Sequence, residues 1–206
     1  MALYQQLLDE FGYNEPFFTD EITYGSYSRA WLYKELAKLC ADRSIVRFEK
    51  GAYYIPTQTI LGASMINPKR VIEKRYIRSA GRVYGYYGGL TFMNQLGLST
   101  QMPNVLEVYT NNEASKFRDV NVGRQKILLR KSRVKVTESN AAVLSFLELM
   151  NTLSESDLDD AGKAIITKYI DDNRITRKDI TNFAPAFPDR TMRNLIESEV
   201  IYHVAR

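Results

Sequence analysis

Side chains that could carry out covalent or metal chemistry are few in this 206-residue sequence. It contains one cysteine, Cys40, and one histidine, His203, which are separated by most of the chain. A zinc site needs three or four convergent ligands, and a cysteine nucleophile needs a base within hydrogen-bond reach. The sequence therefore predicts no metal, no cofactor and no Cys–His catalytic pair. We expect Cys40 to be a packed residue of a helix.

Two other patterns could suggest an enzyme. A group of aspartates could form a two-metal nuclease site, but its members stand at the two ends of a predicted helix, where capping and solvation explain them. They are Asp157, Asp159, Asp160, Asp171 and Asp172. The glycines of residues 81–89 lack the Gly-Lys-Ser/Thr ending of a phosphate-binding loop. We therefore predict a protein that is not an enzyme.

Polar, aromatic and basic residues cluster at the start of a predicted helix over 29–41. Such side chains at the beginning of a recognition helix read base edges in the major groove of DNA. The residues that we expect to do so are Tyr27, Ser28, Arg29, Tyr33 and Lys34.

Further cations are expected to contact the DNA backbone or minor groove. Two belong to a predicted hairpin, and five to a predicted basic helix over 69–78, within a basic segment 69–82. They are Arg47 and Lys50 in the hairpin, and Lys69, Arg70, Lys74, Arg75 and Arg78 in the helix.

The order of predicted elements in residues 1–57 is typical of a winged helix-turn-helix domain. A helix over 2–11 is followed by a short helix from Thr19, a break at Gly25, the helix 29–41 and a hairpin over 45–55. An α+β module of the same fold that binds protein remains the alternative.

Residues 58–206 are predicted to form a mixed α+β domain with a small sheet and a C-terminal helical bundle. Period-two patterns predict strands over 105–110, 117–122 and 126–130. Helical patterns predict helices near 140–151, 157–172, 176–183 and 189–197. The fold class is therefore expected to be α+β.

The charge is unevenly distributed along the chain. The net charge is +4, but residues 58–137 carry +10, whereas residues 1–57 carry −2 and residues 138–206 carry −4. The basic stretch fits a polyanion such as DNA, RNA or an acidic protein face, and it equally fits ordinary solvation. Three tyrosines beside it could stack on bases or could pack at the seam between the domains. They are Tyr84, Tyr86 and Tyr87.

The sequence has no signal-peptide pattern at its N-terminus and no apolar run approaching the ~20 residues that span a bilayer. A single cysteine suits a reducing compartment. We expect a cytoplasmic protein without a membrane partner.

Several blocks resemble AbiEi-type antitoxins. The stretch 87–103, and above all Gly97-Leu-Ser-Thr-Gln101, resembles the "aLs-GLstQ-p" block of that family. The stretches 105–111 and 180–190 resemble its later blocks, and the hairpin Gly51-Ala-Tyr-Tyr-Ile-Pro56 resembles its "G-x-Y" hairpin.

The resemblance implies an antitoxin of a type IV, abortive-infection toxin–antitoxin system that acts in phage defence. It implies an N-terminal winged helix that represses its own operon and a C-terminal domain that is needed for antitoxin activity. The implied partners are double-stranded promoter DNA and a nucleotidyltransferase toxin, with which no stable complex is required. The alternative is a winged-helix protein-interaction adaptor without toxin neutralisation.

Overall fold

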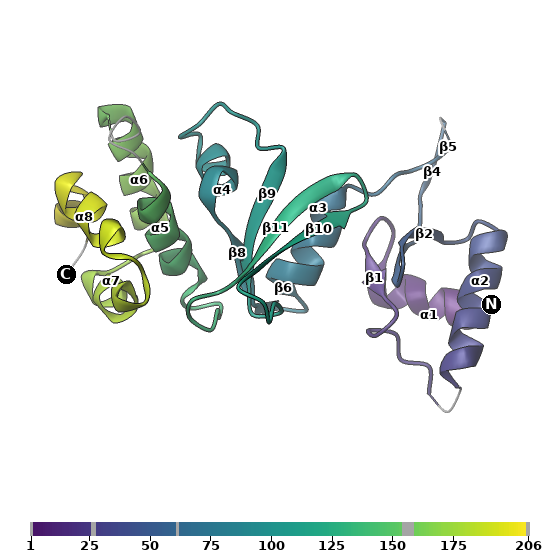
Figure 1. Ribbon diagram of the computed structural model, residues 1–206. Helices are drawn as coiled ribbons and strands as arrows, with labels where there is room; N and C mark the ends of the chain where they lie inside the picture. The colour runs from purple at the N-terminus through teal and green to yellow at the C-terminus, as the bar shows by residue number, and fades with distance from the viewer. Residues whose placement is uncertain (1, 26–27, 61, 154–158, 205–206) are drawn as a thin grey trace. The chain divides into compact units, whose positions relative to one another are not determined.

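The protein is described by a computed structural model, which covers residues 2–25, 28–60, 62–153 and 159–204 (Figure 1). Its fold is α+β, as predicted, and it contains two compact units. The first unit comprises residues 1–74 with 122–124, and the second comprises 75–121 with 125–206. We predicted a domain boundary after residue 57. That prediction concerns whether residues 58–206 fold without residues 1–57, and it stays a prediction.

The first unit packs two helices against a three-stranded antiparallel sheet, in the order β1-β3-β2. The elements are α1 (Ala2–Phe11), β1 (Phe17–Phe18), α2 (Arg29–Ala41), β2 (Val46–Glu49) and β3 (Ala52–Tyr54). Leu32 and Leu36, four residues apart, direct one face of α2 into the core. Phe17 is fully buried, with its ring stacked 5.1 Å from Phe11 and 6.0 Å from Tyr53. The core therefore sets which face of α2 remains exposed.

The short helix that we predicted from Thr19 is absent, and residues 19–21 form a turn instead. The amide of Thr19 donates to the carbonyl of Gly51 at 3.1 Å, which continues the strand pairing. The Glu21 carboxylate accepts from the amide of Phe18 at 2.9 Å. The chain on either side of Thr19 is therefore held in strand and turn geometry, which is why the prediction of a helix here was wrong.

A small hairpin and a basic helix follow the first sheet. The hairpin pairs β4 (Gln58–Thr59) with β5 (Gly62–Ala63). Helix α3 (Pro68–Ile72) begins at Asn67, whose side chain accepts from the amide of Lys69 at 2.9 Å. It continues as the π-helical turn η1 (Glu73–Ile77). The predicted helix over 69–78 is thus formed, with a widened second half.

The second unit begins with a mixed four-stranded sheet, in the order β10-β11-β9-β8. Strand β11 runs parallel to β9, with Ile127 beside Leu106 and Leu129 beside Val108, and β8 runs antiparallel to β9. Its strands are β8 (Gly85–Tyr87), β9 (Val105–Thr110), β10 (Phe117–Val122) and β11 (Gln125–Lys131), with a separate hairpin of β6 (Arg78–Ser79) and β7 (Arg82–Val83). The three strands predicted over 105–130 are therefore confirmed.

The glycines before α4 (Gly89–Leu96) allow close approach of backbone and side chains. A Cβ on Gly85 would lie 2.0 Å from the carbonyl oxygen of Tyr76, and one on Gly88 would lie 2.5 Å from the ring of Tyr109. The Tyr109 ring in turn stacks on Tyr86, with centroids 5.2 Å apart and planes 5° apart. Tyr86 therefore packs in the core of the second unit, which corresponds to neither of the two alternatives considered for it, stacking on bases or packing at a seam between domains.

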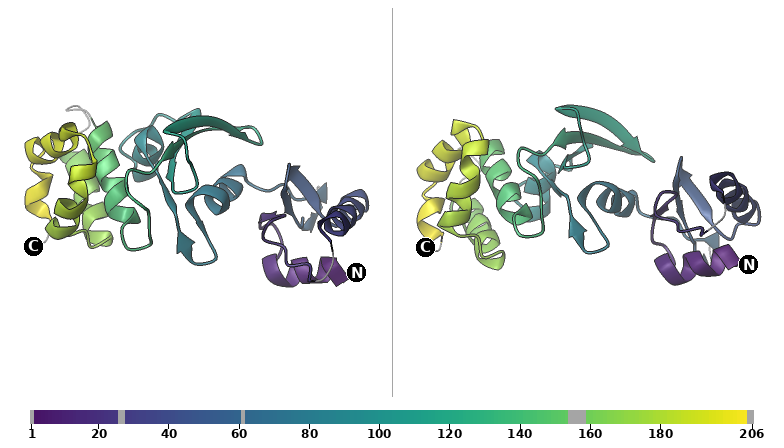
Figure 2. Two further views of the ribbon diagram at one scale, coloured as in Figure 1. Left: turned by 60° about the horizontal axis from the view of Figure 1, so that its bottom comes forward. Right: turned by 90° about the horizontal axis from the view of Figure 1, so that it is seen from below.

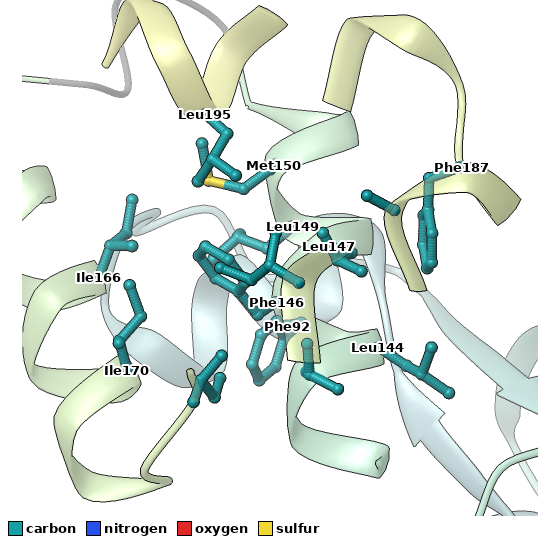
Figure 3. Packing of buried hydrophobic residues seen from close by; sticks show 14 of the residues in the cluster. Phe92, Leu144, Phe146, Leu147, Leu149, Met150, Ile166, Ile170, Phe187 and Leu195 are labelled. Atoms are coloured by element: carbon teal, nitrogen blue, oxygen red, sulfur yellow. The ribbon is translucent and has the colours of Figure 1, made fainter. Parts of the chain in front are cut away.

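Among the described residues, four α-helices and two short 3-10 turns complete the second unit. They are α5 (Ala141–Thr152), α6 (Asp160–Asp172), α7 (Arg177–Phe183), η3 (Ala184–Ala186), α8 (Asp189–Glu197) and η4 (Val200–His203). Helix α5 is central, since every residue from Val143 to Met150 is buried. Figure 3 shows Phe146, Leu149 and Met150 of this helix among side chains of α6 and α8. The four predicted helices are therefore confirmed, although Asp157 lies outside the described residues.

No helix formed by the described residues is both long and apolar enough to cross a membrane.

Candidate nucleic-acid interface

Helix α2 presents an exposed face that combines cations with alanines. Its N-terminus is capped by Ser28, whose hydroxyl accepts from the amide of Trp31 at 3.2 Å. Because Leu32 and Leu36 are buried, the opposite side of the helix is left to solvent. The exposed residues of this side are Arg29, Ala30, Tyr33, Lys34, Ala37, Lys38 and Ala41. Because alanine side chains are short, the middle of this face is recessed between the longer polar side chains on either side of it.

Arg29 and Tyr33 form a pair one helical turn apart on that face. The Arg29 guanidinium donates to the Tyr33 hydroxyl at 3.3 Å and lies 5.8 Å from the centroid of the ring. This hydrogen bond raises the pKa of Arg29 and lowers that of Tyr33. Tyr33 therefore restrains a guanidinium that is otherwise open to solvent.

The β2–β3 hairpin lies beside α2 and adds two cations. Arg47 donates from Nε to the carbonyl oxygen of Glu49 at 3.4 Å, which orients its guanidinium along the hairpin. A pocket of about 430 Å³ separates α2 from the hairpin. Its lining residues are Tyr33, Ala37, Cys40, Arg47, Lys50, Gly51 and Tyr53. Three residues predicted to contact DNA, namely Tyr33, Arg47 and Lys50, therefore meet at one concave surface.

Lys38 on this face pairs with Glu35 at 2.5 Å, whereas the other cations of the surface have no carboxylate partner among the described residues. Within the described part of the chain, Arg29, Lys34, Arg47 and Lys50 form no ion pair. The positive charge is therefore available to an anionic ligand, although the sequence of the first domain is net acidic.

Cys40 lines the pocket but is not prepared for nucleophilic chemistry. It is half-buried on α2, and burial raises the pKa of its thiol, although nearby Arg47 acts in the opposite direction. A reactive cysteine needs its thiol pKa lowered. The residue therefore serves packing, in line with its leucine-rich surroundings.

The cations near α3 that we predicted to contact the DNA backbone differ from those of α2, because two of them are already paired with carboxylates. Arg70 pairs with Glu15, and Lys74 pairs with Glu21 at 3.0 Å. Lys74 also donates to the carbonyl oxygen of Pro16 at 2.7 Å and lies 4.6 Å from the centroid of the Phe11 ring. These two cations hold α3 and the turn η1 against the rest of the first unit, whereas Lys69 is exposed without such a partner among the described residues.

The remaining predicted residues are not part of this surface. Arg75 and Arg78 belong to the second unit, and Tyr27 lies outside the described residues. The structure thus brings together Ser28, Arg29, Tyr33, Lys34, Arg47 and Lys50. The alanines of α2, which the sequence reasoning missed, share this face, and their spacing at i, i+7 and i+11 could have revealed them.

A second group of ionisable residues, which the sequence reasoning also missed, is buried in the other unit. Glu148 is 1% exposed and accepts from Arg133 at 3.1 Å and from Asn151 at 2.9 Å. Glu107 pairs with Arg130 and accepts from the Tyr109 hydroxyl at 3.0 Å. Burial raises the pKa of Tyr109. Because each carboxylate already has an arginine partner, this network joins elements and leaves no free base.

No group of three or more His, Cys, Asp or Glu side chains among the described residues could hold a metal ion.

Comparison with known proteins places the chain in a family. No curated protein and no solved structure is significantly similar to it. Residues 16–178 match the model of a family of unknown function, DUF6088, and this match spans well over half of the chain. The protein therefore belongs to the DUF6088 family.

Proposed function

We propose that the first unit is a winged helix-turn-helix DNA-binding module, and that the protein is the antitoxin and transcriptional autorepressor of a type IV toxin–antitoxin operon. It binds its promoter DNA and counteracts a nucleotidyltransferase toxin in the cytoplasm. The observation that carries the DNA-binding part is the exposed face of α2. That face carries the unpaired cations Arg29 and Lys34 around a recessed strip of alanines. The β2–β3 hairpin beside it adds two further cations.

The α2 face suits the major groove, which is wide enough to admit one helix. Ala30, Ala37 and Ala41 permit the helix backbone to approach the floor of the groove. Arg29 is then the residue that contacts a guanine edge, because arginine and guanine form two parallel hydrogen bonds. Tyr33 holds the guanidinium in place and so lowers the entropy cost of binding.

The β2–β3 hairpin acts as the wing. Arg47 and Lys50 stand across the pocket from Tyr33, so one backbone phosphate can be held between hairpin and helix. The turn at residues 19–21 stands where the motif usually has its second helix. Lys69 adds a phosphate contact, with smaller contributions from Arg70 and Lys74, since these two already face carboxylates.

The antitoxin part of the proposal rests on the resemblance of residues 87–111 and 180–190 to the antitoxin family. These stretches belong to the second unit, which has its own hydrophobic core around α5. In this proposal the first unit binds DNA and the second unit neutralises the toxin.

Binding to the DNA upstream of its own gene tests the first part. Arg29→Ala should weaken binding by about 1–3 kcal/mol, roughly 5- to 150-fold, and relax the sequence preference at one base pair. Arg193→Ala, which removes an exposed arginine from α8, is the matched control and should bind like the wild type. Equal affinities of the wild type and Arg29→Ala would refute the role of Arg29, and no operator binding by the wild type would refute the repressor.

Co-expression with the nucleotidyltransferase toxin that the proposal expects to be encoded next to the gene tests the second part. The double variant Arg29→Ala/Lys34→Ala should lose operator binding and still protect cells from the toxin. Colony survival is the measurement. If the wild type binds its operator but protects no cells, the antitoxin role is wrong. If it neither binds the operator nor protects, a protein-interaction adaptor is the better description.

A further inference from the structure

The small β4–β5 hairpin of the first unit has no part in the function proposed above. Its two strands pair antiparallel, and each of their residues is exposed. Neither strand contributes to the core that α1 and α2 form with the three-stranded sheet (Figure 2). Ile60, in the loop between the strands, is 105% exposed, the highest value among the described large apolar side chains. Figure 1 shows β4 and β5 projecting from the unit, so the hairpin presents an apolar tip to solvent.

The base of this hairpin is fastened to the unit by a network of hydrogen bonds. The Ser64 hydroxyl accepts from the amide of Thr57 at 2.9 Å and donates to the side chain of Asn14. Asn14 in turn donates to the Thr57 hydroxyl at 3.1 Å. The Tyr54 hydroxyl, on β3 of the proposed wing, donates to the carbonyl of Ser64 at 3.1 Å. A single exposed apolar side chain is common on protein surfaces, but these bonds fix the direction in which Ile60 is presented.

The hairpin is narrow and lies in a stretch of sequence without carboxylates. Residues 50–72 contain three Lys or Arg and no Asp or Glu, so no charge of this stretch repels a phosphate. Strand β5 carries only the small side chains of Gly62 and Ala63. The Thr59 hydroxyl donates to the carbonyl of Gly62 at 2.7 Å, which closes the loop that carries Ile60. A slim, uncharged stem with an apolar tip fits a narrow groove that has negatively charged walls.

We propose that the β4–β5 hairpin enters the minor groove of DNA and that Ile60 inserts between two neighbouring base pairs as a wedge. The inference rests on the proposed DNA-binding function of the first unit and adds a contact to it. Strands of other proteins enter the minor groove, and isoleucine is among the side chains that part base pairs there and kink the duplex by about 20–90°. The exposed amide of Gln58 can donate to the acceptors that A·T pairs present in this groove.

A lipid surface or a second copy of the chain would also bury an apolar tip. DNA is favoured because the base of the hairpin is bonded to β3, within the unit that we propose to bind DNA. The stretch without carboxylates and the hydrogen-bonding amide of Gln58 suit a polyanion with polar base edges.

Fluorescence of 2-aminopurine in an operator duplex tests the wedge, because this adenine analogue brightens when it is unstacked. With the analogue at successive positions, the full chain should raise the fluorescence at one base step. Energy transfer between dyes on the two duplex ends should report a bend. At saturating protein, Ile60→Ala should lose both signals. The matched control Ile196→Ala removes an isoleucine of α8 that is 52% exposed, and it should keep both. Signals that are unchanged in Ile60→Ala would overturn the proposal.

The groove is tested with base pairs that differ only on their minor-groove side. Guanine carries a 2-amino group there that inosine lacks, whereas both present the same atoms to the major groove. Replacing inosine by guanine at the parted base step should weaken binding of the wild type more than binding of Ile60→Ala. If this replacement does not affect the wild type, Ile60 is not in the minor groove and the proposal is wrong.

Further outcomes separate this inference from the proposed function and from the other partners. Arg29→Ala should weaken operator binding but keep the bend at saturating protein. Operator binding by the wild type without a bend would refute the wedge alone. Bending of random duplex DNA without preference for the operator would support the wedge and refute the repressor. Binding to anionic phospholipid vesicles, or a dimer in sedimentation, that Ile60→Ala abolishes while DNA stays unbent would overturn the wedge.

Discussion

Glu113 shows at the scale of one residue how a buried carboxylate is stabilised without a metal. It is 5% exposed, accepts from the amide of Ser115 at 3.0 Å and pairs with Arg118 through Nε at 3.0 Å and a terminal nitrogen at 2.9 Å. The bond from Ser115, aided by Arg118, lowers the pKa of Glu113 below its usual 4.5. The charged form is thus the one that the fold stabilises.

Glu113→Gln should lower the free energy of unfolding at neutral pH by about 2 kcal/mol, because hydrogen bonds to a charged group are removed. A carboxyl group with a lowered pKa in the folded state contributes stability above pH 4.5, and this contribution disappears as the pH falls below that value. The difference between variant and wild type should therefore shrink in acid. Urea unfolding at several pH values measures it, with Glu138→Gln, at an exposed site, as the control. A difference that is independent of pH would contradict the assignment.

Single residues also show which side-chain contacts can be predicted from the sequence and which cannot. The Arg29–Tyr33 pair follows from a spacing of four residues on a helix, so its proximity could be predicted. The partners of Arg70 and Lys74 could not, because Glu15 and Glu21 lie more than fifty residues earlier in the chain. The same holds for Glu148 and Arg133, which only the tertiary fold brings into contact.

At the scale of elements, predictions succeeded where the pattern was long. The strands over 105–130 and the helices over 140–197 have clear periods, and caps such as Thr176 with Asp179 mark their ends. Short elements escaped prediction. The two-residue strand β1 has no period, and its pairing of Phe17 with Tyr53 depends on the hairpin far along the chain. Similar non-local bonds turned the expected helix at Thr19 into a turn.

The block Gly97-Leu-Ser-Thr-Gln101 forms the end of α4. Gly97 has φ +80°, its amide donates to Asn94 at 3.1 Å, and the amide of Leu98 donates to Met93 at 2.9 Å. This is the Schellman arrangement, in which glycine supplies the left-handed residue after a helix. The Asn94 side chain donates to the carbonyls of Ser99 and Gln101. Helix termination thus explains why glycine and asparagine stand here.

Gly97→Ala should destabilise the second unit by about 1 kcal/mol, because a Cβ is strained at positive φ even though the site has room. Thermal unfolding measures the effect. Gly97→Asn, which tolerates the left-handed region better, should recover part of the stability. An alanine variant as stable as the wild type would show that α4 can end in another way.

At the scale of the whole molecule, two hydrophobic clusters of the described residues lie in different units, and other buried apolar residues, such as Ile127 and Leu129, belong to neither cluster. One contains Leu36 with its neighbours in the first unit, and the other surrounds α5, with Leu147 fully buried. Since neither cluster includes residues of the other, damage to one should not be relieved by the other. This separation is compatible with our proposal that DNA binding and toxin neutralisation reside in different units.

Calorimetry of Leu36→Ala and Leu147→Ala tests that separation. Each change should cost about 2–5 kcal/mol, as large-to-small changes at fully buried sites do. Leu36→Ala should lower the melting temperature of one transition, and Leu147→Ala that of another. A single transition that shifts equally in both variants would mean that the units unfold together. The exposed change Leu90→Ala serves as the control.

The strand order β10-β11-β9-β8 also bears on how the chain is made by the ribosome. Strand β11 lies between β9 and β10 in the sheet but is synthesised after both. Until residue 131 has emerged from the ribosomal tunnel, β10 has no neighbour and one edge of β9 is open, with Leu106 and Val108 uncovered on its apolar face. A nascent chain that stalls or ends between residues 123 and 131 therefore exposes one unpaired strand, β10, and one open edge of β9, which are templates for aggregation.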